Sequence, residues 1–381
     1  MKYKTYTVKD VKKASAENKF SVISCFAGGG GSSTGYRLAG GKILLINEFV
    51  EEAISSYKKN YPDTPVLVDD IKKYSGQDFL DKVKLKEGEL DILDGSPPCS
   101  AFSVAGKREK GWDKTKNYSD GKTVENIEDL FLDFIRVAKE IKPKVIVAEN
   151  VKGITFGEAT KKLNEFIKAF ESIGYYVTYK VLNAADFGVP QARERTIFIC
   201  VREDVADAIG LSFLNLVGIF PGEFGYQISM EDAIENIKND ENEIKELKEY
   251  YEGSFQKKFL DPIPFRPKRH MKPSDPEFRD WNPKASCFNM IRPCPTLPSP
   301  TLTQQGQKKG LSGVFHYADN RKLTIKELKR LMSLPEDYEL TGTFDQQAER
   351  IGRMVAPKMM AEVANSIYEK VLKPYNEANH E

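Results

Sequence analysis

A single cysteine lies in a turn that two prolines stiffen. In the stretch GSPPCSAFS, Cys99 follows Pro97 and Pro98 and comes soon after the apolar run LDIL. Each proline restricts the residue before it to extended geometry, so the pair sets the direction in which the thiol points. A thiolate is a nucleophile, and nearby cations or helix N-termini favour its formation. We interpret Cys99 as a candidate nucleophile; the alternative is a surface turn with an incidental thiol.

Acidic and basic groups follow or precede other apolar runs of the first two hundred residues. Glu149 closes the run PKVIVAEN, and the segment QARER places Arg193 and Arg195 before the run TIFICV. A carboxyl group beside a thiol suggests proton donation to a heteroatom of a substrate, and guanidinium groups suit phosphate or carbonyl oxygens. Taken singly, Glu149 could cap a helix and Arg193 could form an ion pair. Taken together with Cys99, these groups predict an active site.

The glycine-rich segment FAGGGGSSTG indicates a bound small molecule. It follows an apolar run and precedes a helical stretch, and glycines at such a turn let the backbone approach a ligand closely. The spacing does not match the dinucleotide fingerprint, because the third glycine position, counted from Gly28 or Gly29, holds Ser33 or Thr34. A flexible tight turn is the alternative.

Two carboxylates end the next two apolar runs and narrow the class of ligand. Glu48 would lie at the same edge as the glycine turn and suits a ribose diol, and Asp70 suits an exocyclic amine. The alternative for each carboxylate is capping of a helix N-terminus. An adenosine-bearing ligand without a pyrophosphate fits the glycines and both carboxylates.

These groups need a scaffold that brings the ends of several strands to one edge. Through residues 1–202, short apolar runs alternate with amphipathic stretches, and the runs are continuous, as in strands buried on both faces. This pattern predicts an α/β fold, with a doubly wound, mostly parallel sheet and helices on both faces. Ligands of such sheets bind at the carboxyl ends of the strands, where the candidate groups would lie.

The composition and the periodicity of the sequence change after residue 202. An acidic helical stretch is followed by the segment FQKKFLDPIPFRPKRHMK, which mixes prolines, aromatic and basic residues without a regular period. The last part of the chain is again helical and apolar-periodic. We predict a catalytic and cofactor-binding domain over 1–202, a second, smaller domain over 203–295, and a C-terminal segment over 296–381 that returns to the first domain.

Composition excludes several classes of protein. The 381 residues carry a net charge of +1, so any nucleic-acid surface must be a local patch. No apolar stretch approaches the roughly 20 residues that span a bilayer, and the start of the chain lacks the apolar core of a secretory signal. The five cysteines are scattered without a C-x-x-C pair, which argues against a disulfide framework and a four-cysteine zinc site. We expect a cytoplasmic protein without a membrane segment or a metal.

In this order, the segments resemble the motifs of DNA (cytosine-5) methyltransferases of the prokaryotic or phage type. FAGGGGSSTG is similar to the cofactor-loop pattern F-A-G-x-G-G-x-x-x-G, GSPPCSAFS to the nucleophile loop, and ENV and QARER to the next two blocks. PTLT, at 300–303, and the closing stretch from LTIKELKRLMSLPEDY to IGRMVAP resemble the last two blocks. The resemblance covers nearly the whole chain. One departure is the last block, usually G-N-[SA]-[VI], where Arg353 and Met354 here follow Gly352.

The resemblance implies a role for each group of the predicted active site. Cys99 would be the nucleophile, and Glu149 would hold the N3 and N4 edge of a cytosine. Arg193 and Arg195 would meet the carbonyl oxygen of the base or a nearby phosphate. S-adenosylmethionine would be the cofactor, with Phe26 stacked on its adenine.

The resemblance also implies the other contacts to S-adenosylmethionine. Glu48 would hold the ribose, and Asp70 with Ile71 would hold the adenine. Pro98 and Leu130 would line the methionine side. The predicted cofactor contacts are Phe26, Ala27, Gly28, Gly30, Gly31, Glu48, Phe49, Asp70, Ile71, Pro98, Leu130 and Val355.

Between QARER and PTLT the family carries a target-recognition domain, which here would read duplex DNA. The segment FQKKFLDPIPFRPKRHMK offers basic residues amid phenylalanines, and such residues contact guanine edges and phosphates. The lysine-rich stretch after Cys99 would be a lid that closes over the polyanion. The predicted DNA contacts are Ser103, Lys107, Arg108, Lys257, Lys258, Arg266, Lys268 and Arg269. A solvated loop is the alternative for the recognition segment.

The implied function is transfer of a methyl group from S-adenosylmethionine to C5 of a flipped-out cytosine in a specific duplex DNA sequence, through a covalent bond between Cys99 and C6. Cytosine C5 is a weak nucleophile without that bond, and C6 is reached only when the base leaves the stack. Two alternatives are a tRNA cytosine-5 methyltransferase and a non-catalytic DNA-binding relative. The expected partners are double-stranded DNA and, in a restriction-modification system, a cognate endonuclease. The protein is expected to be a monomer.

Overall fold

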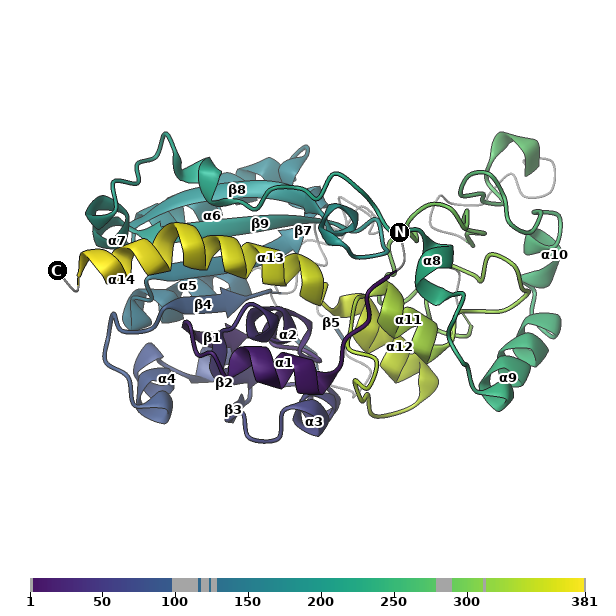
Figure 1. Ribbon diagram of the computed structural model, residues 1–381, viewed down its shortest axis with the longest axis horizontal. Coiled ribbons are helices and arrows are strands. Elements are labelled where there is room, and N and C mark those ends of the chain that lie inside the picture. Colours follow the sequence, from purple (N-terminus) through teal and green to yellow (C-terminus); the bar gives the residue numbers. More distant parts are fainter. Residues whose placement is uncertain are drawn as a thin grey trace. The chain divides into compact units, whose positions relative to one another are not determined.

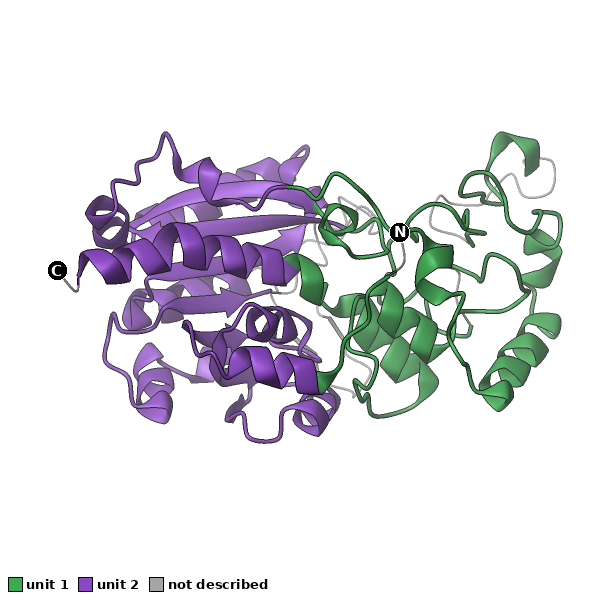
Figure 2. Ribbon diagram, in the orientation of Figure 1, with its two compact units in different colours: residues 1–8, 183–193, 223–359 green, residues 9–182, 194–222, 360–381 purple. Residues whose placement is uncertain are grey.

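The computed structural model describes residues 3–97, 116–117, 123–124, 129–278, 290–310 and 313–379. They form two compact units (Figure 2). The sheet unit contains residues 9–182, 194–222 and 360–381, and the helical unit contains residues 1–8, 183–193 and 223–359. Each unit is assembled from segments that are distant in the sequence. The domain boundaries inferred at 202 and 295 remain predictions.

A mostly parallel sheet of seven strands forms the centre of the sheet unit (Figure 1). Its strands are β1 (Ser21–Cys25), β2 (Lys42–Glu48), β3 (Val66–Val68), β4 (Ile92–Gly95), β7 (Val145–Val151), β8 (Tyr175–Asn183) and β9 (Glu194–Arg202). Neighbours follow the order β3-β2-β1-β4-β7-β9-β8. The first five of these pair in parallel, and β9 pairs with β7 in antiparallel register. The predicted α/β fold with a doubly wound sheet is confirmed.

The strand order reverses at β1. From β1 the chain continues to β2 and β3 on one side, and it returns to β4 on the other side. In sheets of this kind, ligands bind beyond the carboxyl ends of the strands at the reversal point. The segments that leave β1 and β4 there are the glycine turn and the stretch that leads to Cys99.

Helices cover both faces of the sheet (Figure 1). One face is packed by α4 (Gly76–Val83), α5 (Asp129–Ile141) and α6 (Ala159–Glu171). Phe79, Phe134 and Phe166 of these helices join Ile23 of β1 and Leu93 of β4 in one large apolar cluster. Continuous apolar runs were expected for such strands, because alternate side chains bury against helices on opposite faces. The helices in front of the sheet in Figure 1 are α1 (Val8–Ser15), α2 (Gly31–Leu38) and α13 (Pro357–Ile367).

Shorter elements complete the sheet unit and connect its strands. They are α3 (Glu51–Asn60), η1 (Ile71–Lys73), η3 (Lys152–Thr155), α7 (Glu203–Ala208), η5 (Leu216–Ile219), η7 (Tyr368–Leu372), α14 (Lys373–Ala378) and the antiparallel pair β5 (Lys116–Asn117) and β6 (Thr123–Val124). Among the described helices, none combines the length and the apolar character that crossing a bilayer requires.

The helical unit consists of short helices and irregular segments. Its helices are η4 (Ala184–Phe187), α8 (Met230–Ile234), α9 (Glu241–Glu252), α10 (Lys257–Leu260), η6 (Pro276–Phe278), α11 (Ile325–Leu331) and α12 (Phe344–Arg353). Thr324 caps α11 by accepting a hydrogen bond from the Glu327 backbone N–H at 3.2 Å. Both carboxylate oxygens of Glu327 accept hydrogen bonds from the buried Arg321 guanidinium at 2.8 Å. This bidentate pair fixes the start of the segment LTIKELKRLM.

Candidate active site

The glycine turn begins with a strained residue. Phe26, the first residue after β1, has a φ of 55°, a left-handed conformation that is rare for a bulky side chain. Gly28 and Gly30 follow with φ values of 54° and 88°, and α2 begins at Gly31. Strain of this kind persists only where the surrounding structure holds it, and it clusters at ligand sites. The turn is therefore a candidate binding loop at the carboxyl edge of the sheet.

Backbone hydrogen bonds hold the carboxylate of Glu48 against this turn. Glu48 Oε2 accepts from the Gly28 N–H at 2.7 Å, and Oε1 accepts from the N–H groups of Phe49 and Val50 at 2.9 Å each. The residue is 6% exposed, so these bonds fix its position. Because a carboxylate oxygen can accept more than one hydrogen bond, Glu48 retains the capacity to accept from a ribose hydroxyl.

Four of the predicted cofactor contacts meet in one apolar cluster of the sheet unit. Ile71 and Leu130 are buried in it, and the partly buried Phe26 and Phe49 pack against it. The Phe26 ring meets Phe134 edge to face, with 6.4 Å between the ring centroids. A partly exposed aromatic ring on an apolar base suits stacking with a flat heterocycle.

The remaining predicted cofactor contacts are placed differently. Asp70 Oδ1 accepts a hydrogen bond from the Lys72 N–H at 3.0 Å, so Asp70 caps η1. Capping of a helix N-terminus was the alternative hypothesis for this carboxylate. Ala27 is buried within the turn. Val355 is buried in the helical unit, and Pro98 lies outside the described residues. These cofactor assignments remain predictions.

An ion pair joins the predicted acid to one of the predicted arginines. Arg195 Nε lies 2.7 Å from Glu149 Oε1, and the two side chains are 14% and 13% exposed. In the antiparallel register of β7 and β9, Arg195 opposes Val151 and Ile197 opposes Glu149. Glu149 and Arg195 therefore lie on the same face of the sheet. The pair orients a carboxyl group that solvent can still reach.

The parallel register of β4 and β7 places Glu149 beside the end of β4. Gly95, the last residue of β4, pairs with Ala148. Glu149 thus comes one position beyond the end of β4, and Cys99 follows Gly95 by four positions along the chain. Cys99 and the predicted DNA contacts Ser103, Lys107 and Arg108 lie outside the described residues.

Arg193 is placed unlike Arg195. It is 1% exposed, and its Nη1 and Nη2 donate hydrogen bonds to the carbonyl oxygens of Leu302, at 2.9 Å, and Gly352, at 3.0 Å. These contacts link three sequence motifs, QARER, PTLT and IGRMV, within the helical unit. Beside them Arg353 forms an ion pair with Glu349. The contacts of Arg193 are typical of a residue that positions backbone.

Gly352 should tolerate no side chain. A Cβ there would lie 2.6 Å from the Thr303 carbonyl oxygen and 2.7 Å from the Gln304 nitrogen, both backbone atoms. We expect Gly352→Ala to lower the free energy of unfolding by about 1–3 kcal/mol, because the two segments must separate. Gly253→Ala is the control, since its Cβ would meet Glu249 at an ordinary 3.6 Å. Urea denaturation of both variants checks this; equal midpoints would contradict it.

A buried acid that the sequence reasoning did not single out lies on β4. Asp94 is 1% exposed and accepts hydrogen bonds from the hydroxyls of Ser24, Ser32 and Tyr36. Burial raises the pKa of Asp94 to about 6, although the three hydroxyls act in the opposite direction, and the charge of Glu149 adds to the rise. Its only sequence signal is an acid inside an apolar run, LDILD.

The raised pKa of Asp94 predicts a pH dependence of stability. An unfolded aspartate titrates near pH 4, so between about pH 4 and pH 6 the unfolded chain releases this proton while the folded chain keeps it. The contribution of Asp94 to the free energy of unfolding should therefore fall across that window by roughly 2–3 kcal/mol and stay level above it. Asp94→Asn removes the titration. Urea denaturation from pH 4 to pH 8 should show the stability of the variant rising relative to the original protein up to pH 6; a constant difference would contradict this.

Three of the five described basic residues that were predicted to contact DNA are paired with acids. Lys257 pairs with Glu252, and Arg266 pairs with Glu231. Arg269 contacts Asp275 and Glu277 at 2.6 Å each. The predicted contacts without an acidic partner in the described chain are Lys258, whose Nζ lies 4.9 Å from the centre of the Phe259 ring, and the exposed Lys268. These five DNA contacts also remain predictions.

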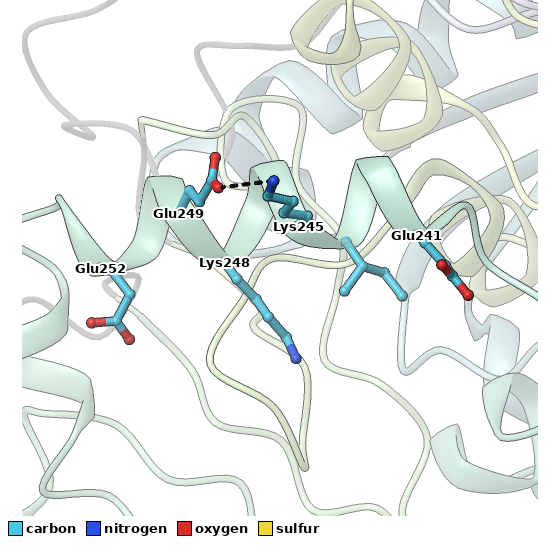
Figure 3. Close-up of a pocket in the computed structure, with 6 residues that line it drawn as sticks. Glu241, Lys245, Lys248, Glu249 and Glu252 are labelled. Atoms are coloured by element: carbon cyan, nitrogen blue, oxygen red, sulfur yellow. Dashed lines mark ion pairs between the residues drawn. The ribbon is translucent and has the colours of Figure 1, made fainter.

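A surface hollow is lined by none of the predicted site residues. It measures about 550 Å³ and is formed by side chains of α9 alone (Figure 3). Lys245 and Glu249 form an ion pair across it at 3.8 Å, and Lys248 pairs with Asp319 at 3.0 Å. Both lysines of the hollow are thus paired with acids, and the hollow holds none of the residues that the sequence assigned to chemistry.

Comparison with known proteins identifies the family. A family model described as C-5 cytosine-specific DNA methylase matches residues 20–369. The Type II methyltransferase M1.HphI of Haemophilus parahaemolyticus is 33% identical over 358 residues, which cover 92% of this chain and 86% of that protein. The Type II methyltransferase M.NgoFVII of Neisseria gonorrhoeae is 30% identical over 370 residues, which cover 94% of this chain and 90% of that protein.

Solved structures share the fold. A prophage-encoded DNA modification methyltransferase of Escherichia coli has a TM-score of 0.66 at 19% identity, with coverage of 92% of this chain and 99% of that one. DNMT2 of Spodoptera frugiperda has a TM-score of 0.59 at 18% identity, with the same coverage.

The doubly wound sheet with a glycine turn after β1 and the family match together define the class, which is that of S-adenosylmethionine-dependent methyltransferases. Within that class, the chain belongs to the C-5 cytosine-specific DNA methylase family. The protein is a DNA (cytosine-5) methyltransferase, S-adenosylmethionine is its cofactor, and the family resemblance found in the sequence is confirmed.

Proposed function

We propose that the protein methylates C5 of a flipped-out cytosine in a specific sequence of duplex DNA through a covalent bond between Cys99 and C6. The ion pair of Glu149 and Arg195 beside the end of β4 is the observation that carries this proposal. It supplies an acid and a cation next to the strand that leads to Cys99. Family membership supplies the target base and the position of the methyl group.

The residues of the glycine turn fit S-adenosylmethionine. Glu48, fixed by three backbone N–H groups, would accept hydrogen bonds from the ribose hydroxyls. Phe26 would stack on the adenine, with the apolar cluster around Ile71 and Leu130 beside it. Gly28 adopts a conformation that favours glycine and leaves room at the backbone. When bound, S-adenosylmethionine supplies an electrophilic methyl group on a sulfonium.

The bond at C6 makes C5 nucleophilic. The Cys99 thiolate would add to C6, and the electrons of the C5–C6 double bond would move into the ring toward N3, which takes a proton from Glu149. C5 is then an enamine carbon and attacks the methyl group. A base removes the C5 proton, the Cys99 thiolate leaves C6, and the N3 proton returns to Glu149. The products are 5-methylcytosine, S-adenosylhomocysteine, which keeps the electrons of the broken sulfur–methyl bond, the protonated base and a free thiolate.

Arg195 would hold Glu149 and meet the base. Its Nε pairs with Glu149, and its Nη1 donates to the Glu194 carbonyl oxygen at 2.8 Å. A guanidinium carries five N–H donors, so further donors remain for the carbonyl oxygen of the base or a phosphate. The contacts of Arg193 with two backbone carbonyls instead favour a positioning role for that residue.

Duplex DNA and a cognate restriction endonuclease are the proposed partners of a monomer. Several relatives carry the name Type II methyltransferase, which supports an endonuclease that reads the same sequence. Flipping the base costs about a few kcal/mol, and contacts from exposed lysines such as Lys258 and Lys268 to phosphates would offset that cost. A DNA substrate also favours an intracellular location.

Labelling followed by sequencing tests the proposed function. The protein is incubated with tritiated S-adenosylmethionine and either unmethylated plasmid DNA or tRNA, and bisulfite sequencing then locates the modified cytosines. We expect label in the plasmid at cytosines of one short sequence. Label in tRNA alone would favour the tRNA alternative. Label in neither substrate would overturn the proposed reaction, and titration calorimetry with S-adenosylmethionine would then test the non-catalytic alternative.

A further inference from the structure

Asp94 is a buried carboxylate that takes no part in the reaction described above. Its Oδ2 accepts hydrogen bonds from Ser24 Oγ at 2.7 Å and Ser32 Oγ at 2.8 Å, and its Oδ1 accepts from Tyr36 OH at 3.1 Å. Within the described chain, no lysine, arginine or histidine forms an ion pair with it. Burying a charge without a cation is costly, so hydroxyl groups alone compensate this carboxylate.

The three hydroxyls come from two elements next to β4. Ser24 belongs to β1 and pairs directly with Asp94 in the parallel register. Ser32 and Tyr36 are four residues apart on α2, so they lie on the same face of that helix. The carboxylate therefore ties the end of β4 to β1 and to the first two turns of α2.

All three hydrogen bonds run in one direction, from hydroxyl to carboxylate. Burial, followed by the charge of Asp94, raises the pKa of Tyr36 well above its usual value, so the phenol keeps its proton. Above about pH 6 Asp94 is ionised and can only accept. Loss of the carboxylate leaves the Ser32 hydroxyl without its acceptor at the start of α2.

This hydrogen-bond network connects the predicted cofactor turn with the strand that leads to the predicted nucleophile. Ser32 directly follows Gly31 of the glycine turn, and Asp94 precedes Cys99 by five positions. The motif F-A-G-x-G-G-x-x-x-G leaves the place of Ser32 open, so the hydroxyl is a feature of this chain and not a requirement of the motif.

We propose that Asp94 is a positioning residue that couples the cofactor turn to the nucleophile strand through its hydrogen bond with Ser32. This inference rests on the proposed function for the roles of the turn and of Cys99. Without the bond, the position of the start of α2 relative to the end of β4 would no longer be fixed. A misplacement of about 1 Å can cost roughly a hundredfold in rate, so the effect should appear both in cofactor affinity and in methyl transfer.

Ser33 provides a matched control for Ser32. It is also fully buried on α2, and its hydroxyl has no hydrogen-bond partner in the described chain. Ser32→Ala and Asp94→Ala should lower kcat/KM for S-adenosylmethionine by about 10- to 100-fold, while Ser33→Ala stays within about twofold of the original protein. The double variant Ser32→Ala and Asp94→Ala should be no worse than Asp94→Ala alone, because both changes remove the same hydrogen bond.

Calorimetry and thermal denaturation at pH 8 complete the test. We expect weaker binding of S-adenosylmethionine, about tenfold, in Ser32→Ala and Asp94→Ala. The melting temperature of Ser32→Ala should stay within about 4 °C of that of Ser33→Ala, because it loses one hydrogen bond. Unchanged affinity and rate in both variants would overturn the inference. So would equal losses in Ser33→Ala, or losses that follow melting temperature. If the original protein transfers no label to DNA, the proposed function fails, and the affinities still decide whether the turn depends on Asp94.

Discussion

Replacing Cys99 with alanine should abolish methyl transfer to DNA, with a loss of about 10⁴-fold or more in kcat. The reason is chemical: without a bond at C6, cytosine C5 does not attack the methyl group. Binding of S-adenosylmethionine should survive, because the residues that fit the cofactor belong to the glycine turn and to the apolar cluster beneath it. Tritium transfer measures the first quantity and titration calorimetry the second.

A covalent trap tests the role of Cys99 directly. Duplex DNA that carries 5-fluorocytosine in the methylated sequence should form an adduct that resists denaturant, because fluorine cannot leave C5 as a proton does. Cys99→Ala should form none. Cys294→Ala is the control, since Cys294 is a buried thiol of the helical unit whose Sγ lies 3.2 Å from Thr296 Oγ1. Methyl transfer by Cys99→Ala, or an adduct on that variant, would end the proposed mechanism.

Glu149→Gln should lower kcat by about 10²- to 10⁴-fold with little change in cofactor affinity. Glutamine keeps the size of the side chain and can accept from Arg195, which lies 2.7 Å from the carboxylate, but it cannot pass a proton to N3. The adduct with 5-fluorocytosine DNA should form more slowly for the same reason. Single-turnover kinetics with excess enzyme measure this step without product release.

A nearby ion pair of the same length offers a control. Lys152 Nζ, at the start of η3, lies 2.7 Å from Glu194 Oε1 of β9, but the two side chains are 37% and 48% exposed. Exposed pairs contribute about 0–1 kcal/mol, so Glu194→Gln should leave kcat within about twofold. A Glu149→Gln variant as active as Glu194→Gln would remove Glu149 from the mechanism.

The two arginines of QARER show what a motif leaves open. They are two positions apart, and both suit a carbonyl or phosphate oxygen, so the sequence could not distinguish them. In the structure, the register of β7 and β9 brings Arg195 to Glu149. Arg193 precedes β9 and donates to carbonyl oxygens of residues 302 and 352, more than a hundred positions away. Only folding brings those carbonyls within reach.

The DNA-contact predictions meet a similar limit. The segment FQKKFLDPIPFRPKRHMK reads as a basic patch because its lysines and arginines are close in sequence. One acid that pairs with them is distant in sequence: Glu231 lies 35 positions from Arg266. The composition of a segment gives the number of its charges. The binding of a nucleic acid depends on which charges remain exposed and unpaired in the folded protein.

By itself, the sequence determined the sheet and the family, and it predicted the reacting groups. The sheet was predictable because parallel strands that are buried on both faces are apolar throughout. The family was predictable because its motifs follow the strands in a fixed order along the chain. The tertiary structure alone decided which groups meet: Glu149 with Arg195, Arg193 with two distant carbonyls, and Asp94 with three hydroxyls. Hydrogen bonds and ion pairs depend on distances of about 3 Å in space, and the spacing of residues along a chain does not specify such distances.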